Sequence, residues 1–128
     1  MNTVADPLVH QAVAEFGRGL GLSTLALDDA GHAALRLQSG VVMHISLAAN
    51  DLVLQIDCPL AFEGPELLER ALVAADLRQG VGVQLGLRGR GADQVLQVAR
   101  RLPWRQGTAA AMGRGFEQLI DWFEGLRP

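Results

Sequence analysis

The sequence predicts an α+β fold, in which helices lie on one side of a twisted antiparallel sheet. Apolar residues recur at helical spacing near both ends of the chain, alternate with a period of two in between, and are separated by short turn-forming segments. The expected order is helix, strand meander, helix, hairpin, helix. With 128 residues, 49% of them hydrophobic, the chain has the size and composition of one compact domain over residues 1–128.

The first helix is expected to begin with Asp6 as its N-cap and Pro7 at the first helical position, where the missing N–H costs nothing. Three glycines between residues 17 and 21 weaken the helix and are expected to end it. Its apolar stripe comprises Val9, Val13, Phe16 and Leu20, widened by Leu8 and Ala12.

A period of two begins at Leu22 and predicts antiparallel strands joined by short turns. The alternating apolar residues are Leu25 and Leu27, then Leu35 and Leu37, then Met43, Ile45 and Leu47, and finally Leu52, Leu54 and Ile56. The opposite face carries Arg36, Gln38, His44, Ser46, Gln55 and Asp57. One face of this meander is therefore expected to be buried and the other polar.

A second helix is expected to begin at Gly64-Pro65. Its apolar residues, Leu67, Leu68, Leu72, Val73 and Leu77, occupy more than one side. A helix that covers a single core needs only one apolar side, so this pattern predicts a second buried face, such as a subunit interface.

Two further strands are expected over Gly82 to Leu87 and Gln94 to Leu102, separated by a glycine-rich turn. Thr108 is the expected N-cap of the last helix. The apolar stripe of that helix is Met112, Phe116, Leu119, Ile120 and Phe123.

Composition excludes several classes of protein. All 11 basic residues are Arg, interleaved with 14 acidic ones to a net charge of -3, which argues against a nucleic-acid partner. No run approaches the roughly 20 apolar residues of a membrane span, and no secretory signal is visible, so we expect no membrane partner and a cytoplasmic protein. The single cysteine, Cys58, excludes an intramolecular disulfide.

The sequence shows no grouping typical of catalysis, and we expect no catalytic, cofactor-binding or metal-binding residues. The glycines at 17–21 follow a helix, and the chain has no Lys, so neither a dinucleotide fingerprint nor a P-loop is present. The histidines lack zinc-site spacing and lie in separate elements from Cys58. Asp28, Asp29 and Asp51 are explained by turns, and Trp104 and Trp122 by packing or an interface.

Three segments resemble the class I chaperones of bacterial type III secretion systems, also called the Tir chaperone or CesT family. These segments are Leu25-x-Leu27-Asp28-Asp29-x-Gly31; Leu67-Leu68-x-x-Ala71-Leu72-x-Ala74-Ala75 with Gly82-x-x-Leu85-Gly86-Leu87; and the closing helix with Leu119, Trp122 and Phe123. The likeness covers nearly the whole chain. It departs from the family at Ala75-Asp76-Leu77, where the family often has Ala-Asn.

The resemblance implies a homodimer that binds the N-terminal segment of a secreted effector without ATP. The implied dimer interface comprises Leu67, Leu68, Ala71, Leu72, Ala75, Val83 and Leu85. The implied effector-binding residues are Val9, Val13, Phe16, Leu35, Leu37, Met43 and Ile45. Strand alternation alone is also explained by core packing, so the pattern does not separate groove residues from core residues.

Two alternatives stay open at this point. One is a small-ligand-binding or enzymatic domain that uses Cys58 or His44. The other is a regulatory adaptor that binds a secretion ATPase or a transcription regulator through the same surface.

Overall fold

The computed structural model describes residues 7–60, 83–89 and 93–125. Its strands are β1 (His32–Arg36), β2 (Val42–Ala48), β3 (Asp51–Pro59), β4 (Val83–Arg88) and β5 (Val95–Pro103). Its helices are α1 (Pro7–Gly19), α3 (Ala109–Glu124) and the short 3-10 helix η3 (Trp104–Gln106). The expected second helix lies outside the described residues.

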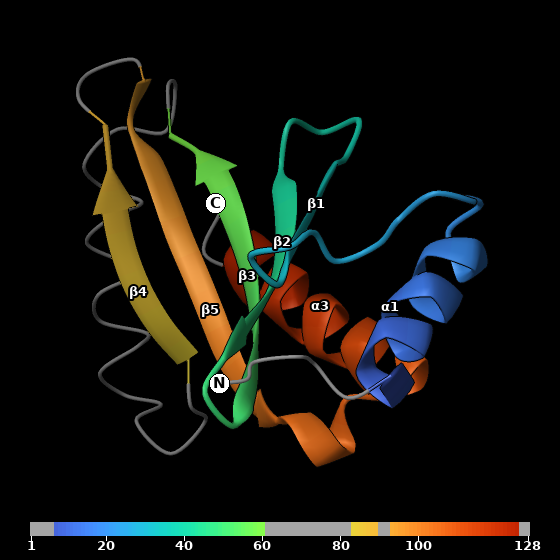
Figure 1. Cartoon of the computed structure of the whole chain (residues 1–128). Coiled ribbons are helices and arrows are strands. Elements are labelled where there is room, and N and C mark those ends of the chain that lie inside the picture. The colour runs from blue at the N-terminus through green and yellow to red at the C-terminus, as the bar shows by residue number, and fades with distance from the viewer. Residues whose placement is uncertain (1–6, 61–82, 90–92, 126–128) are drawn as a thin grey trace.

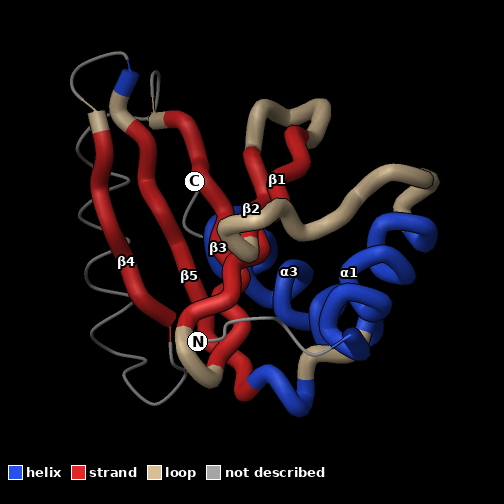
Figure 2. The backbone as a smooth tube through the Cα atoms, viewed as in Figure 1, coloured by secondary structure: helices blue, strands red, loops and turns tan. Residues whose placement is uncertain are grey.

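The five strands form one antiparallel sheet in the order β1-β2-β3-β5-β4 (Figure 1). Both α1 and α3 lie on the same side of this sheet (Figure 2). The α+β class, the meander, the hairpin and the two flanking helices are therefore confirmed. Within the described residues β1 and β4 each pair with a single neighbour, so they form the two edges of the sheet.

One expected strand is absent. Leu25 and Leu27 lie in irregular chain before β1, although Leu27 is buried. Asp28 Oδ1 accepts hydrogen bonds from the backbone N–H groups of Ala30 at 2.9 Å and His32 at 3.0 Å, which closes a turn directly before β1. The side chain of Leu25 instead contacts α1 at Gly17, where an added Cβ would lie 2.6 Å from Leu25 Cβ. The alternation here reflects burial against α1 and the core, not strand pairing.

The core lies between the sheet and the two helices. α3 begins as expected, because Thr108 Oγ1 accepts a hydrogen bond from Ala111 N at 3.1 Å. α3 packs on β3 and β5, and α1 packs on α3. The rings of Phe16 and Phe116 stack with centroids 5.5 Å apart, which joins the two helices.

Gly115 sets how closely α3 approaches the sheet. An added Cβ would overlap the Cδ1 atom of Leu54, which is fully buried on β3. Gly113, two residues earlier in the same helix, has no atom within 4 Å of the corresponding position. The two glycines therefore differ in what a side chain would meet.

We expect Gly113→Ala to raise the free energy of unfolding by up to about 1 kcal/mol, because alanine favours helix over glycine. Gly115→Ala brings the same gain but forces Leu54 to move, at a cost of about 1–3 kcal/mol. Urea denaturation followed by circular dichroism measures both. Equal effects of the two substitutions would contradict the close contact between α3 and β3.

Candidate functional site

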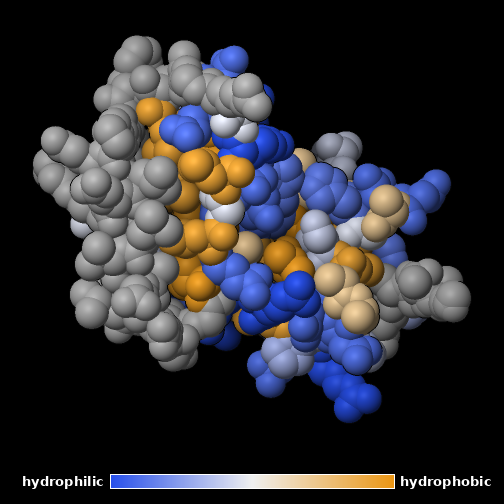
Figure 3. Space-filling view, turned by 90° about the vertical axis from the view of Figure 1, so that its left-hand side faces the viewer, coloured by the Kyte–Doolittle hydropathy of each residue, from blue (hydrophilic) through white to orange (hydrophobic). Residues whose placement is uncertain are grey.

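The β4 edge presents an apolar surface. Val83 and Leu85 are half-buried and pack against the core, and Leu87 is 46% exposed. We call these three residues the β4 strip; they share one face because they alternate along the strand. Figure 3 looks onto the side of the molecule where β4 lies in Figure 1 and shows apolar surface beside the grey residues.

The β4 strip contains two of the residues expected at a dimer interface, Val83 and Leu85. Leu87 was not among the interface residues expected from the sequence, although the same alternation places it on the same face of β4. The remaining expected interface residues lie outside the described part of the chain: Leu67, Leu68, Ala71, Leu72 and Ala75.

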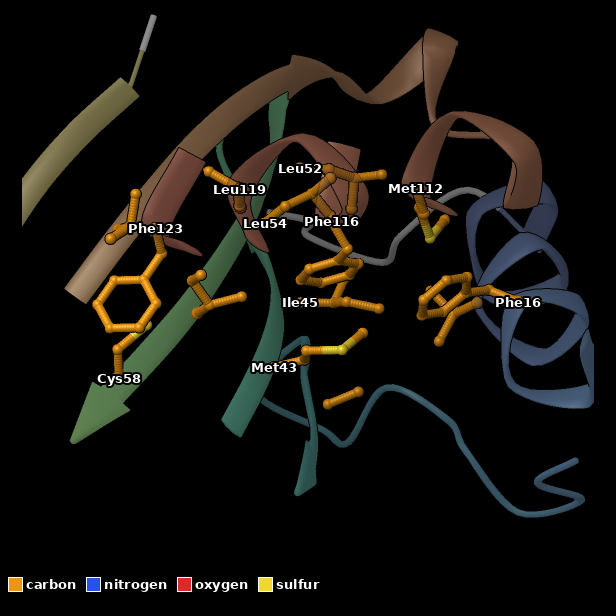
Figure 4. Packing of buried hydrophobic residues seen from close by; sticks show 14 of the residues in the cluster. Phe16, Met43, Ile45, Leu52, Leu54, Cys58, Met112, Phe116, Leu119 and Phe123 are labelled. Carbon is orange, nitrogen blue, oxygen red and sulfur yellow. The ribbon is translucent and has the colours of Figure 1, made fainter. Parts of the chain in front are cut away.

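Most of the expected effector-binding residues are buried in this chain. The five buried residues are Val9, Val13, Phe16, Met43 and Ile45. Figure 4 shows Phe16, Met43 and Ile45 among the packed side chains between sheet and helices. Leu35 and Leu37 are half-buried at the border of this core. Contact with an effector stays a prediction for all seven residues. Of the seven, Leu35 and Leu37 expose the most side chain for such a contact.

An apolar groove lies beside α1. Its cavity has a volume of about 320 Å³ and separates α1 from the start of α3. We call it the α1 groove; it is lined by Leu8, Val9, Gln11, Ala12, Glu15, Trp104, Arg105, Gly107, Thr108 and Ala109. Leu8 is 70% exposed at its rim, and Trp104 is half-buried. A groove of this kind suits an apolar side chain of a bound polypeptide.

The outer edge of β1 is open. Along the described chain, β1 pairs with β2 from His32↔Ser46 to Arg36↔Val42 and has no ladder on its other side. An unpaired strand edge offers backbone N–H and C=O groups to an added strand. The β1 edge therefore suits an extended polypeptide.

A polar network lies on the sheet face opposite the helices. Asp57 is 4% exposed, and its carboxylate accepts hydrogen bonds from His44 Nε2 at 2.9 Å, Gln55 Nε2 at 2.7 Å and Arg88 Nη2 at 3.2 Å. His44 Nδ1 is hydrogen-bonded to His32 Nε2 at 2.9 Å. These five residues, which we call the histidine network, link β1, β2, β3 and β4. The polar face expected from the sequence contains His44, Gln55 and Asp57 but not His32 or Arg88.

The histidine network does not form a nucleophilic site with Cys58. Cys58 follows Asp57 directly, so its side chain points to the opposite face of β3, where it is fully buried in the core. A Cys58 nucleophile with His44 as its base is therefore not formed, because the two side chains lie on opposite faces of the sheet. No group of three His, Cys, Asp or Glu side chains suited to a metal ion occurs among the described residues.

Among the described residues, the sheet has two edge strands and an apolar groove lies beside α1, which are features of a small α+β protein suited to contact with other polypeptides. No helix in the part of the chain that the structure describes is long and apolar enough to cross a membrane.

The sequence profile of the Tir chaperone protein (CesT) family matches residues 11–127. The chain belongs to this family. The resemblance found in the sequence is thus confirmed, and membership of a chaperone family makes this chain a binding protein and not an enzyme. A search of curated protein sequences found no match.

Solved structures show the same fold. The ExsC–ExsE complex contains a chain that matches with a TM-score of 0.76 and 22% identity, over 95% of this chain and 92% of that one. The HopA1–SchA chaperone–effector complex matches with a TM-score of 0.71 and 20% identity, over 99% and 98%. The Yersinia pestis type III secretion chaperone SycH, in complex with a stable fragment of YscM2, matches with a TM-score of 0.68 and 16% identity, over 92% and 98%.

We expect Asp57→Ala to lower the free energy of unfolding by about 1–3 kcal/mol, because it leaves the partners of a buried carboxylate without their acceptor. Asp51→Ala is the control, since it removes an exposed ion pair to Arg101 at 3.4 Å and costs less than about 1 kcal/mol. Urea denaturation compares the two. Equal losses would show that the histidine network contributes nothing beyond a surface ion pair.

Proposed function

We propose that this protein is a cytoplasmic, homodimeric type III secretion chaperone that binds the N-terminal segment of a secreted effector without ATP and keeps it competent for secretion. The observation that carries the proposal is the family match over residues 11–127. The chaperone–effector and chaperone–fragment complexes named above are similar in fold and support it. Delivery of the effector to a secretion ATPase belongs to the same proposal.

In this proposal the effector segment is extended. It adds a strand to the open β1 edge and places an apolar side chain in the α1 groove. Backbone hydrogen bonds supply affinity at the edge, and the groove selects the side chain. Leu35 and Leu37, which border the core near this edge, are the expected residues best placed to contact the added chain.

The β4 strip is the proposed contact with a second copy. Val83 and Leu85 were expected there, and Leu87 exposes nearly half of its surface. Leu87 exposes apolar surface on an edge strand, and such surface favours aggregation unless a specific partner covers it. A two-fold contact between the strips of two copies would cover both at once.

Leu87→Asp should convert a dimer into a monomer, because a charge buried at an apolar interface without a partner costs several kcal/mol. Leu20→Asp is a matched control, since Leu20 is 48% exposed and lies just after α1. Size-exclusion chromatography with light scattering should give twice the 13.7 kDa chain mass for the wild type and for Leu20→Asp. A wild type that stays monomeric at micromolar concentration contradicts the dimer.

Effector binding is tested with the product of the neighbouring open reading frame. Its N-terminal segment, co-expressed with this chain, should copurify and become resistant to limited proteolysis. Leu8→Asp should weaken the complex about tenfold, because it puts a charge at the rim of the apolar α1 groove. Leu20→Asp should bind like the wild type. A segment that is neither retained nor protected by the wild type removes the proposed function.

A further inference from the structure

A second, polar pocket lies between α3 and the end of β5. Its volume is about 380 Å³. We call it the arginine pocket; its described lining comprises Arg100, Leu102, Gln106, Thr108, Ala111, Arg114, Gly115 and Gln118. Two guanidinium groups therefore line it, and none of its described lining residues is acidic. The lining also offers amide and hydroxyl groups, so the pocket is rich in hydrogen-bond donors.

Arg100 breaks the pattern of its own strand. The β5 residues that face the helices are Leu96, Val98, Arg100 and Leu102, because Leu96 and Val98 are buried in the core and side chains alternate along a strand. Arg100 pairs in register with the apolar residues Leu54 and Val83 on either side. An arginine at a half-buried, otherwise apolar position is costly to desolvate, so core packing does not explain it.

Arg114 approaches the same pocket from α3, where it is exposed. Neither arginine forms a hydrogen bond or ion pair within the described structure, whereas Arg88 and Arg101 each reach a carboxylate. The later part of α3 does carry acidic residues, Glu117, Asp121 and Glu124, but they lie outside the pocket lining. Two positive charges thus line the same pocket with no acidic residue among its described lining, in a chain whose net charge is -3.

The geometry points to a binding site for a carboxylate, and we infer that it belongs to an Asp or Glu side chain of the bound polypeptide. Guanidinium forks match the planar geometry of a carboxylate and donate two parallel hydrogen bonds to it. The assignment to a polypeptide rests on the proposed function, because free phosphate would satisfy the same donors.

The arginine pocket adjoins the α1 groove. Thr108 lines both, at the point where α3 begins. A polypeptide that places an apolar side chain in the α1 groove needs only a few further residues to reach the arginine pocket. The inferred ligand is thus an extended segment with an apolar residue and, a few positions along, an acidic one.

The test uses the full chain and two peptides blocked at both ends. Each peptide carries one leucine and, three residues later, either glutamate or its neutral isostere glutamine. NMR follows the side-chain Nε–H signals of Arg100 and Arg114, assigned with Arg100→Gln and Arg114→Gln. The glutamate peptide should shift both signals to saturation and bind about tenfold more tightly than the glutamine peptide.

Each of the two substitutions should reduce the affinity for the glutamate peptide to that for the glutamine peptide. Arg101→Gln is the matched control, since Arg101 is the next residue on β5, on the opposite face, and is paired with Asp51. Arg114 is exposed, so Arg114→Gln keeps the test valid if Arg100→Gln fails to fold.

Four results would overturn the inference. Equal binding of the two peptides, or an equal loss with Arg101→Gln, shows that the pocket does not recognise the carboxylate. Saturation by inorganic phosphate at a lower concentration than the glutamate peptide assigns the pocket to a free anion. If the wild type is a dimer and the double variant Arg100→Gln/Arg114→Gln is a monomer, the arginine pocket belongs to the contact with a second copy. Failure to retain any effector, with the peptide results as expected, removes the proposed function but leaves the pocket.

Discussion

The close contact of α3 with β3 at Gly115 brings the helix layer onto the sheet. α3 packs on the sheet, and α1 reaches the core largely through α3, with Phe16 stacked on Phe116. A side chain at position 115 would overlap Leu54 and force it to move. The α1 groove and the arginine pocket each have one wall on α3, and Gly115 itself lines the arginine pocket.

The elements that sequence analysis predicted well are those whose patterns are local. Alternating apolar residues located β2, β3 and β5, and Thr108 identified the start of α3, because burial and capping act within a few residues. Alternation failed at Leu25, whose side chain packs on α1 and whose backbone lies outside the strands of the described structure. An apolar period of two shows which side chains are buried. It does not show whether the backbone pairs with another strand.

The histidine network and the binding surfaces were harder to predict, because they depend on register between distant segments. His32, His44 and Asp57 meet only because β1, β2 and β3 align at particular residues, which turn lengths set. An apolar pattern also does not separate core residues from groove residues. Val13 and Ile45, which were expected to bind an effector, are buried in the core of this chain. Arg100 could have been noticed in the sequence, because it is a charged residue at a position of β5 where the alternation predicts an inward-facing apolar one. Arg114, which lines the same pocket, lies on α3, so the sequence does not show that the two residues meet.

The two sheet edges differ in what they can accept, and this has a consequence for stoichiometry. If the β4 strips of two copies meet across a two-fold axis, the assembly presents two identical β1 edges and two identical α1 grooves. A polypeptide has no such symmetry. One effector chain must therefore fit different stretches of its sequence to identical surfaces, or leave one half of the dimer vacant for a second chain.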